Sequence, residues 1–174
     1  GASSDQVLVL IDGVRVADQA SPSGGFDFGN LLLGTAGKID VLRGSNSTIW
    51  GSEAVGGVID ISTRTDRGLS GSIEYGARDT LFASAAAGAG NDRVFFGLTG
   101  SWYETDGFSA AASGTETDGS QQFALGTTAF VNLTPSLELF AHGNFAEGEV
   151  EIDDFPAPAF VLADTEDTQK TTRY

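Results

Sequence analysis

The sequence has no cysteine and no methionine, one histidine, four prolines, and nine basic residues against 24 acidic ones in 174 residues. Without cysteine, disulfide frameworks, thiolate metal sites and cysteine nucleophiles are excluded. A single histidine excludes metal sites built from several imidazoles, and no serine–histidine motif accompanies it. The formal net charge of −15 leaves no positive surface for a phosphate backbone, so nucleic acid is excluded as a partner.

Long hydrophobic runs are also missing. No apolar stretch approaches the roughly 18 to 20 residues that a membrane-spanning helix needs. A helical membrane protein is therefore excluded, whereas a β-barrel is not, because alternating strands never produce such a run.

The two halves of the chain differ in composition. Residues 1–67 hold most of the long aliphatic clusters and are predicted to form compact α/β material. Residues 68–174 are rich in Gly, Ala, Ser, Thr and aromatic residues, and their hydrophobicity alternates with a period of two. This pattern predicts β-strands and little else.

In the first half, the apolar run at residues 7–11 is closed by Asp12-Gly13, and residues 14–16 resume the extended pattern. Because this dipeptide favours a tight turn with positive φ, the sequence predicts a β-hairpin. A loop, a short helix and two further strands are predicted after it, at residues 17–29, 30–36, 38–42 and 58–63 respectively.

The second half is predicted to contain five strands of roughly 9 to 11 residues, the length that suits an outer-membrane strand. Its connections alternate in length: residues 88–92 and 134–136 are tight, whereas residues 105–120 and 148–172 are long and acidic. Short turns at one end and long loops at the other are typical of a bacterial outer-membrane barrel. A soluble β-sandwich or β-solenoid is the competing interpretation.

Three ordered motifs carry a family resemblance: residues 7–15 (VLVLIDGVR), 39–44 (IDVLRG) and 50–61 (WGSEAVGGVIDI). Together with the alternating strands that follow, they resemble the second half of the plug domain of TonB-dependent outer-membrane receptors. Within that family the sequence is most similar to the vitamin B12 and siderophore transporters.

The resemblance implies a mixed α/β plug fragment followed by antiparallel transmembrane β-barrel strands, in a plugged barrel of about 22 strands. The expected domains are 1–67, the C-terminal part of the plug, and 68–174, the first five barrel strands and the start of the sixth. The signal peptide, the energy-coupling box and the first half of the plug are expected before Gly1, and the remaining barrel after Tyr174.

The implied function is TonB-dependent uptake of a scarce ligand, cobalamin or an iron siderophore, across the bacterial outer membrane. The implied partners are a TonB-type energy-coupling protein, the cobalamin or metal chelate, and outer-membrane lipid. No covalent chemistry is involved, so an enzyme is not expected. The alternative is a soluble or surface β-rich binding module, an adhesin or a glycan-binding protein, with a stacking platform made of Trp102, Tyr103 and Phe108.

The resemblance also assigns residues. Arg43 corresponds to a plug arginine that acts as a latch by pairing with glutamates of the barrel wall; an ordinary surface salt bridge is the alternative. The glycines of the motifs are expected to permit positive φ or close backbone approach, namely Gly13, Gly44, Gly51, Gly56 and Gly57. The apical plug loop is expected to touch the ligand, or else to be a solvated turn, through Asp18, Gln19, Ser21, Pro22 and Ser23.

Residues 148–172 carry seven carboxylates, against Lys170 as the one basic residue. Calcium, which takes several oxygen ligands, is the candidate cation for this segment, and no other cofactor is expected. A solvated charged loop without metal is the alternative. The expected calcium ligands are Asp118, Asp153, Asp154 and Asp164.

Overall fold

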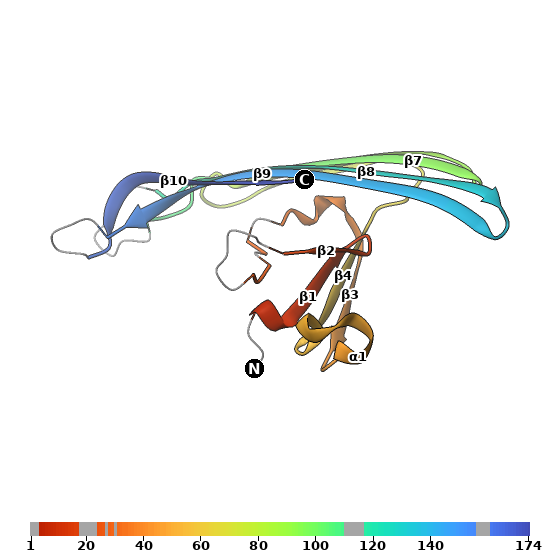
Figure 1. Cartoon of the computed structure of the whole chain (residues 1–174). Coiled ribbons are helices and arrows are strands. Elements are labelled where there is room, and N and C mark those ends of the chain that lie inside the picture. The colour runs from red at the N-terminus through yellow and green to blue at the C-terminus, as the bar shows by residue number, and fades with distance from the viewer. Residues whose placement is uncertain (1–3, 18–23, 27, 30, 110–116, 156–160) are drawn as a thin grey trace.

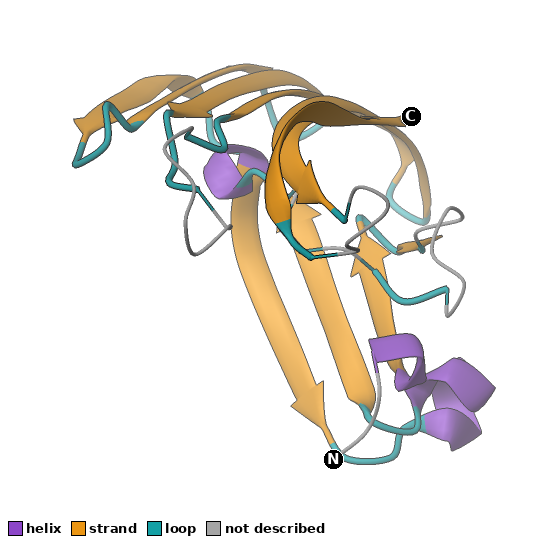
Figure 2. Cartoon of the chain, turned by 90° about the vertical axis from the view of Figure 1, so that its left-hand side faces the viewer, coloured by secondary structure: helices purple, strands orange, loops and turns teal. Residues whose placement is uncertain are grey.

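The chain forms two β-sheets that follow one another in the sequence. The computed structural model describes residues 4–17, 24–26, 28–29, 31–109, 117–155 and 161–174. Its first sheet has four strands in the order β2-β1-β4-β3, and its second has six in the order β10-β9-β8-β7-β6-β5. The six-stranded sheet is a long curved layer that arches over the four-stranded unit (Figures 1 and 2).

The four-stranded sheet mixes parallel and antiparallel pairs. β1 pairs in parallel with β4 and antiparallel with β2, and β3 pairs antiparallel with β4. The parallel pair explains why β1 is a continuous apolar run, since both of its faces are covered. The strands are β1 (Val7–Ile11), β2 (Val14–Val16), β3 (Ala36–Arg43) and β4 (Gly57–Thr63).

Each face of this sheet packs against its own cluster. Leu8, Leu10 and Val58 bury one face together with Ala54, and none of the four is more than 3% exposed. On the other face, Val9 and Ile61 pack with Phe26 from the segment after β2. The side-chain alternation of a strand therefore divides β1 between two small cores.

The predicted hairpin is confirmed. Asp12 and Gly13 connect β1 to β2 with φ values of 51° and 77°, as the tight turn requires. Gly57 has a different reason to be glycine: its φ is 149°, and a Cβ placed there would lie 2.6 Å from the carbonyl oxygen of Leu42 on the neighbouring strand.

The six strands of the second sheet are all antiparallel, each to the next in sequence. The chain passes to this sheet between Thr63 and Gly68, close to the expected domain boundary at residue 67. The strands are β5 (Gly68–Tyr75), β6 (Leu81–Gly90), β7 (Val94–Thr105), β8 (Ser120–Thr134), β9 (Leu137–Asp154) and β10 (Ala163–Arg173).

The two faces of this sheet differ in character. On β7, Phe95, Thr99 and Ser101 are at most 5% exposed, whereas the alternating Phe96 and Leu98 are 56% and 45% exposed. The covered face looks toward the four-stranded unit and carries small or polar side chains at most positions. The open face carries large apolar side chains.

The prediction of a long acidic loop at residues 148–172 is wrong. β9 continues to Asp154 and β10 begins at Ala163, so most of the described residues in this range lie in two paired strands. The physical reason is the alternation of Glu149 and Glu151 with Val150 and Ile152. Carboxylates at every second position can point to solvent while the backbone pairs with its neighbour.

The predicted helix at residues 30–36 is also wrong. Only the 3₁₀ turn η2 (Leu33–Thr35) forms there, and β3 begins directly at Ala36. Glycine and threonine in this segment are poor helix formers. The other helical pieces are η1 (Ser4–Gln6), α1 (Ser47–Trp50) and η3 (Ser52–Ala54), so the described part of the chain contains no helix long and apolar enough to cross a membrane.

We expect Leu10→Ala to destabilise the four-stranded sheet by about 2–5 kcal/mol, because it opens a cavity in a core where Leu10 is 3% exposed. Hydrogen exchange of the β1 and β4 amides measures this change. Val14→Ala, at a side chain that is 63% exposed, is the control and is expected to change stability by less than about 0.5 kcal/mol. Equal loss of protection in both variants would contradict the assignment of the core.

Candidate functional site

The two sheets meet where the β1–β2 turn and the end of β4 reach the covered face of β8 and β9. The Asp12 backbone N–H donates to the Ile61 carbonyl at 2.9 Å, which fixes the turn against β4. The Thr63 N–H donates to Asp12 Oδ1 at 2.8 Å, and the Thr63 hydroxyl donates to the same oxygen at 3.2 Å. The turn therefore presents the Asp12 carboxylate at the tip of the four-stranded unit.

The six-stranded sheet supplies the other half of this contact. Thr63 Oγ1 lies 2.7 Å from Thr128 Oγ1 of β8, and Thr128 Oγ1 lies 3.4 Å from His142 Nδ1 of β9. Thr128 and His142 are directly opposite each other in the β8–β9 register. His142 Nδ1 also lies 3.4 Å from Asp12 Oδ2. We call these four side chains, Asp12, Thr63, Thr128 and His142, the junction cluster.

The two threonines and the Asp12 side chain of the junction cluster are shielded from solvent, whereas His142 lies in a solvent-exposed part of β9 with its side chain partly covered. The side chains of Asp12 and His142 are 5% and 21% exposed, and Thr63 and Thr128 are 8% and 4% exposed. In a shielded position, hydrogen bonds and charges interact more strongly than they do in water. A substitution that removes one of these side chains is therefore costly, because its partner stays buried without a hydrogen bond.

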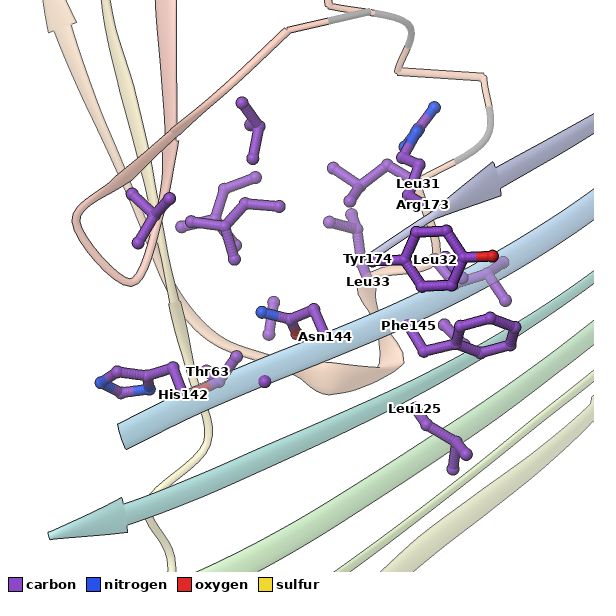
Figure 3. Close-up of a pocket in the computed structure, with 18 of the residues that line it drawn as sticks. Leu31, Leu32, Leu33, Thr63, Leu125, His142, Asn144, Phe145, Arg173 and Tyr174 are labelled. Carbon is purple, nitrogen blue, oxygen red and sulfur yellow. The ribbon is translucent and has the colours of Figure 1, made fainter. Parts of the chain in front are cut away.

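A cavity of about 290 Å³ extends from the junction cluster along the space between the two sheets. Phe26, Leu31 and Ile61 line it from the four-stranded unit, and Ala124, His142 and Arg173 line it from the other sheet. Figure 3 shows Thr63 and His142 at one end and Leu31, Leu33 and Tyr174 at the other. The Arg173 guanidinium lies 4.9 Å from the centre of the Phe26 ring, a cation–π contact across the cavity.

A second contact between the sheets is made by the segment around η2. A Cβ on Gly34 would lie 2.8 Å from Ser101 Cβ and 2.9 Å from Ser84 Cβ, so only glycine fits against the six-stranded sheet at this position. Nearby, Gln122 Nε2 donates to the Gly29 carbonyl at 3.0 Å. This second contact is thus built from small residues and a hydrogen bond, beside a cavity lined mainly by apolar side chains.

Residues 1–58 match the family model described as the TonB-dependent receptor plug domain. The four-stranded unit with its turn at Asp12 lies mostly within this match, and the curved antiparallel sheet follows it. The first 58 residues therefore belong to the TonB-dependent receptor plug-domain family. The four-stranded unit is accordingly plug, and the six-stranded sheet consists of barrel strands in an open, unclosed arrangement.

Curated relatives include proteins named vitamin B12 transporter BtuB. The protein from Vibrio cholerae serotype O1 is 42% identical over 91 residues, which is 51% of this chain and 15% of the relative. The protein from Vibrio vulnificus is 34% identical over 114 residues, which is 62% of this chain and 18% of the relative. The chain thus spans less than a fifth of the length of either relative.

Among solved structures, the siderophore receptor PiuA from Acinetobacter baumannii is similar to this chain with a TM-score of 0.67. The match covers 90% of this chain and 21% of that receptor at 16% identity. At this identity the likeness concerns the fold alone. It confirms the fold class that the sequence predicts, a plug followed by barrel strands.

The expected ligand loop lies outside the described residues, since Asp18, Gln19, Ser21, Pro22 and Ser23 all fall at positions 18–23. Their contact with ligand stays a prediction. The motif glycines are described: Gly13, Gly44, Gly51 and Gly57 have positive φ, and the Gly56 amide donates to the Gln6 carbonyl at 2.7 Å.

The expected latch residue Arg43 is exposed at the end of β3, where its backbone pairs with Gly57. It has no ion pair within the described ranges, so its role as a latch stays a prediction. On the same strand, Lys38 Nζ lies 2.7 Å from Asp40 Oδ2. The hydrogen bond to the Asp40 carboxylate and its negative charge raise the pKa of Lys38 above the ordinary lysine value.

The expected calcium ligands lie at the end of the sheet that carries the long connections. Asp153 Oδ1 accepts the Thr165 N–H at 3.4 Å, and Asp154 Oδ1 accepts the Phe155 N–H at 2.7 Å. Asp118 precedes β8 at the same end, and the side chain of Asp164 is not among those described. No group of three metal-ligating side chains occurs in the described part of the chain. Calcium therefore stays a prediction.

The junction cluster was not predicted as a site. The sequence places Asp12 in a turn and His142 on the polar face of its strand beside Glu138 and Asn144, which predicts only that His142 lines the barrel interior. Thr63 and Thr128 carry no signal of their own, because threonine is common in strands. The one available hint is a lone histidine on a face that must pack against the plug.

We expect Gly34→Ala to weaken the contact between plug and barrel strands by about 1–3 kcal/mol, since the added methyl group overlaps Ser84 and Ser101. Hydrogen exchange of β3, measured in the protein expressed from its complete reading frame, reports the loss. Gly76→Ala is the control, because its Cβ would meet only Thr80 Cβ at 3.8 Å. Removing one obstacle in the double variant Gly34→Ala, Ser101→Gly should restore part of the protection; no recovery would contradict the steric explanation.

Proposed function

We propose that this chain belongs to a receptor that takes up cobalamin or an iron siderophore across the bacterial outer membrane, driven by a TonB-type energy-coupling protein. The observation that carries the proposal is the plug sheet seated against the covered face of six barrel strands, in a chain whose first 58 residues belong to the TonB-dependent receptor plug-domain family. Cobalamin is favoured over a siderophore because the relatives named vitamin B12 transporters match in sequence, at 42% and 34% identity.

The seam between plug and barrel strands suits a plug that must move. Its described direct contacts include hydrogen bonds through Thr63, Thr128 and Gln122 and the close approach at Gly34. Water can replace such hydrogen bonds when the plug shifts, so each contributes only about 0.5–1.5 kcal/mol net. A pulling partner can therefore separate the surfaces one contact at a time, without any covalent step.

The open face of the sheet suits contact with lipid. Val94, Phe96 and Leu98 of β7 are 48%, 56% and 45% exposed, and Leu139 of β9 is 56% exposed. A contiguous apolar surface of this kind is rare on soluble monomers and is the ordinary outer surface of a membrane barrel. This supports the outer membrane as the site of action.

The alternative of a glycan-binding module is less well supported. Trp102 and Tyr103 are consecutive on β7, so their side chains point to opposite faces of the sheet. Trp102 lies against Phe123 with ring centroids 6.4 Å apart, while Phe108 lies under the Arg78 guanidinium at 4.9 Å. The three rings therefore do not form one stacking platform.

We expect Leu98→Arg to reduce insertion into bilayers, because a charged side chain on the lipid face costs about 2–4 kcal/mol near the bilayer midplane. Folding of the complete receptor into lipid vesicles at increasing urea concentration measures the effect. The control, Glu104→Arg, lies one position from the end of β7, where the cost falls to about 0–1 kcal/mol. Equal losses in the two variants would argue against a lipid-facing Leu98.

The function is tested by expressing the complete reading frame in a bacterial strain that lacks its own cobalamin and siderophore receptors. Uptake of radiolabelled cobalamin and of radioiron bound to a panel of siderophores is then measured with and without functional TonB. Uptake of cobalamin only in the presence of TonB is the expected result. Accumulation that does not depend on TonB, or no accumulation of any of these ligands, would overturn the proposal.

A further inference from the structure

The hydroxyl protons of the junction cluster can be assigned from donor and acceptor capacity. A threonine hydroxyl has one proton, and Thr63 donates it to the Asp12 carboxylate. In the 2.7 Å contact between the two hydroxyls, Thr63 must therefore accept, and Thr128 donates. Thr128 in turn can only accept from His142, so Nδ1 of the imidazole carries a proton. All donors point the same way, from the histidine on the barrel strand to the carboxylate on the plug.

One oxygen of the carboxylate is left over. Asp12 Oδ2 is buried and has no hydrogen-bond partner in the described part of the chain, although Oδ1 accepts two hydrogen bonds from Thr63. The group that faces it is His142 Nδ1 at 3.4 Å. An imidazolium at this place supplies the opposite charge that a buried carboxylate oxygen otherwise lacks, whereas a neutral imidazole supplies only a dipole.

We propose that Asp12, Thr63, Thr128 and His142 form a charge-dependent latch between plug and barrel wall, which tightens when His142 is an imidazolium. Asp12 and His142 act by holding the plug in place against the barrel strands. The consequence of the latch depends on the proposed uptake function: if the plug moves during uptake, this movement must break the latch. Acidic surroundings therefore hold the plug more firmly than neutral ones.

The other charged side chains of the plug and of β9 and β10 do not replace this pairing. From the plug, Arg15 pairs with Glu53 at 3.0 Å, and Arg64, next to Thr63, lies 3.7 Å from Asp66. From β10, Arg173 lines the same cavity and lies over the Phe26 ring. On β9 itself, Glu138 is exposed to solvent, and β8 contributes only the neutral Thr128 opposite His142. Asp12 is therefore the carboxylate that meets the imidazole.

The sign of the pH effect follows from the charges. Histidine side chains gain their charge between about pH 8 and about pH 5. A neutral imidazole presents only a dipole to the Asp12 carboxylate, whereas an imidazolium places a positive charge 3.4 Å from Oδ2 and attracts it more strongly. Stability of the seam contributed by the latch is thus fully present at the acidic end and decreases as the pH rises.

The test uses the receptor expressed from its complete reading frame and folded in lipid, without ligand. Hydrogen exchange is followed in the peptides that contain the β1–β2 turn and β4, at about pH 5 and about pH 8. Wild type is compared at each pH with Asp12→Asn and His142→Gln, so that the intrinsic pH dependence of exchange cancels in the ratio. Glu53→Gln is the matched control, since it removes a plug carboxylate that pairs with Arg15 away from the seam.

We expect wild type to be protected about tenfold more than either variant at the acidic pH and only slightly more at the alkaline pH. The double variant should lose no more than either single variant, because the two residues act as a pair. Circular dichroism checks that the variants fold. A protection ratio that does not change with pH, additive losses in the double variant, or an equal loss in Glu53→Gln would each overturn the latch.

The same variants separate this inference from the proposed function. The exchange measurement needs no ligand and no TonB, so the latch can hold in a receptor that takes up neither cobalamin nor a siderophore. Conversely, TonB-dependent uptake that is unchanged by pH and by Asp12→Asn, together with a flat exchange ratio, would leave the function standing and remove the latch.

Discussion

The structure depends on the contact that holds the four-stranded plug sheet against the covered face of the six barrel strands. Asp12 lies at this contact, at the tip of the plug. Its backbone bonds to Ile61 and its carboxylate to Thr63, so the β1–β2 turn and the end of β4 become one rigid corner. That corner is where Thr128 and His142 of the barrel strands make their contacts. If it were lost, the orientation of the parallel β1–β4 pair toward the barrel strands would rest on the contacts at Gly34 and Gln122.

The barrel strands accommodate this corner because their covered face has few large side chains. Gly97, Thr99 and Ser101 of β7 are small, and the exposed Phe96 and Leu98 alternate with them on the other side. Small side chains allow the plug backbone at Gly34 to approach the strands closely. Because successive side chains of a strand point to opposite faces, one sheet can present small side chains to the plug and large apolar side chains on its exterior.

Much of the fold could be predicted from the sequence, because its signals are local. The Asp12-Gly13 turn and the alternation along residues 94–103 are each encoded by a short stretch of neighbouring residues, and both predictions hold. The prediction of a loop over residues 148–172 fails because the number of carboxylates favours a loop, whereas the alternation of Glu149 and Glu151 with Val150 and Ile152 suits a strand. The junction cluster could not be predicted, since Thr63 and Thr128 are brought together only by the packing of one sheet on the other. No periodicity within either strand encodes such a pairing.

The polar contacts of the seam have an energetic consequence. Burial of apolar surface stabilises by about 25 cal/mol per Å². This stabilisation is lost only when the surfaces separate completely, so a wholly apolar seam would resist displacement over its whole area. Hydrogen bonds such as those of Gln122 and Thr128 exchange with water individually and contribute little net free energy each. The exception is a buried charge, for which water is a poor substitute until the surfaces part. Asp12 is the one seam carboxylate in the described part of the chain with a buried oxygen facing a titratable partner, so it can set the threshold for separation while its neighbours set the geometry.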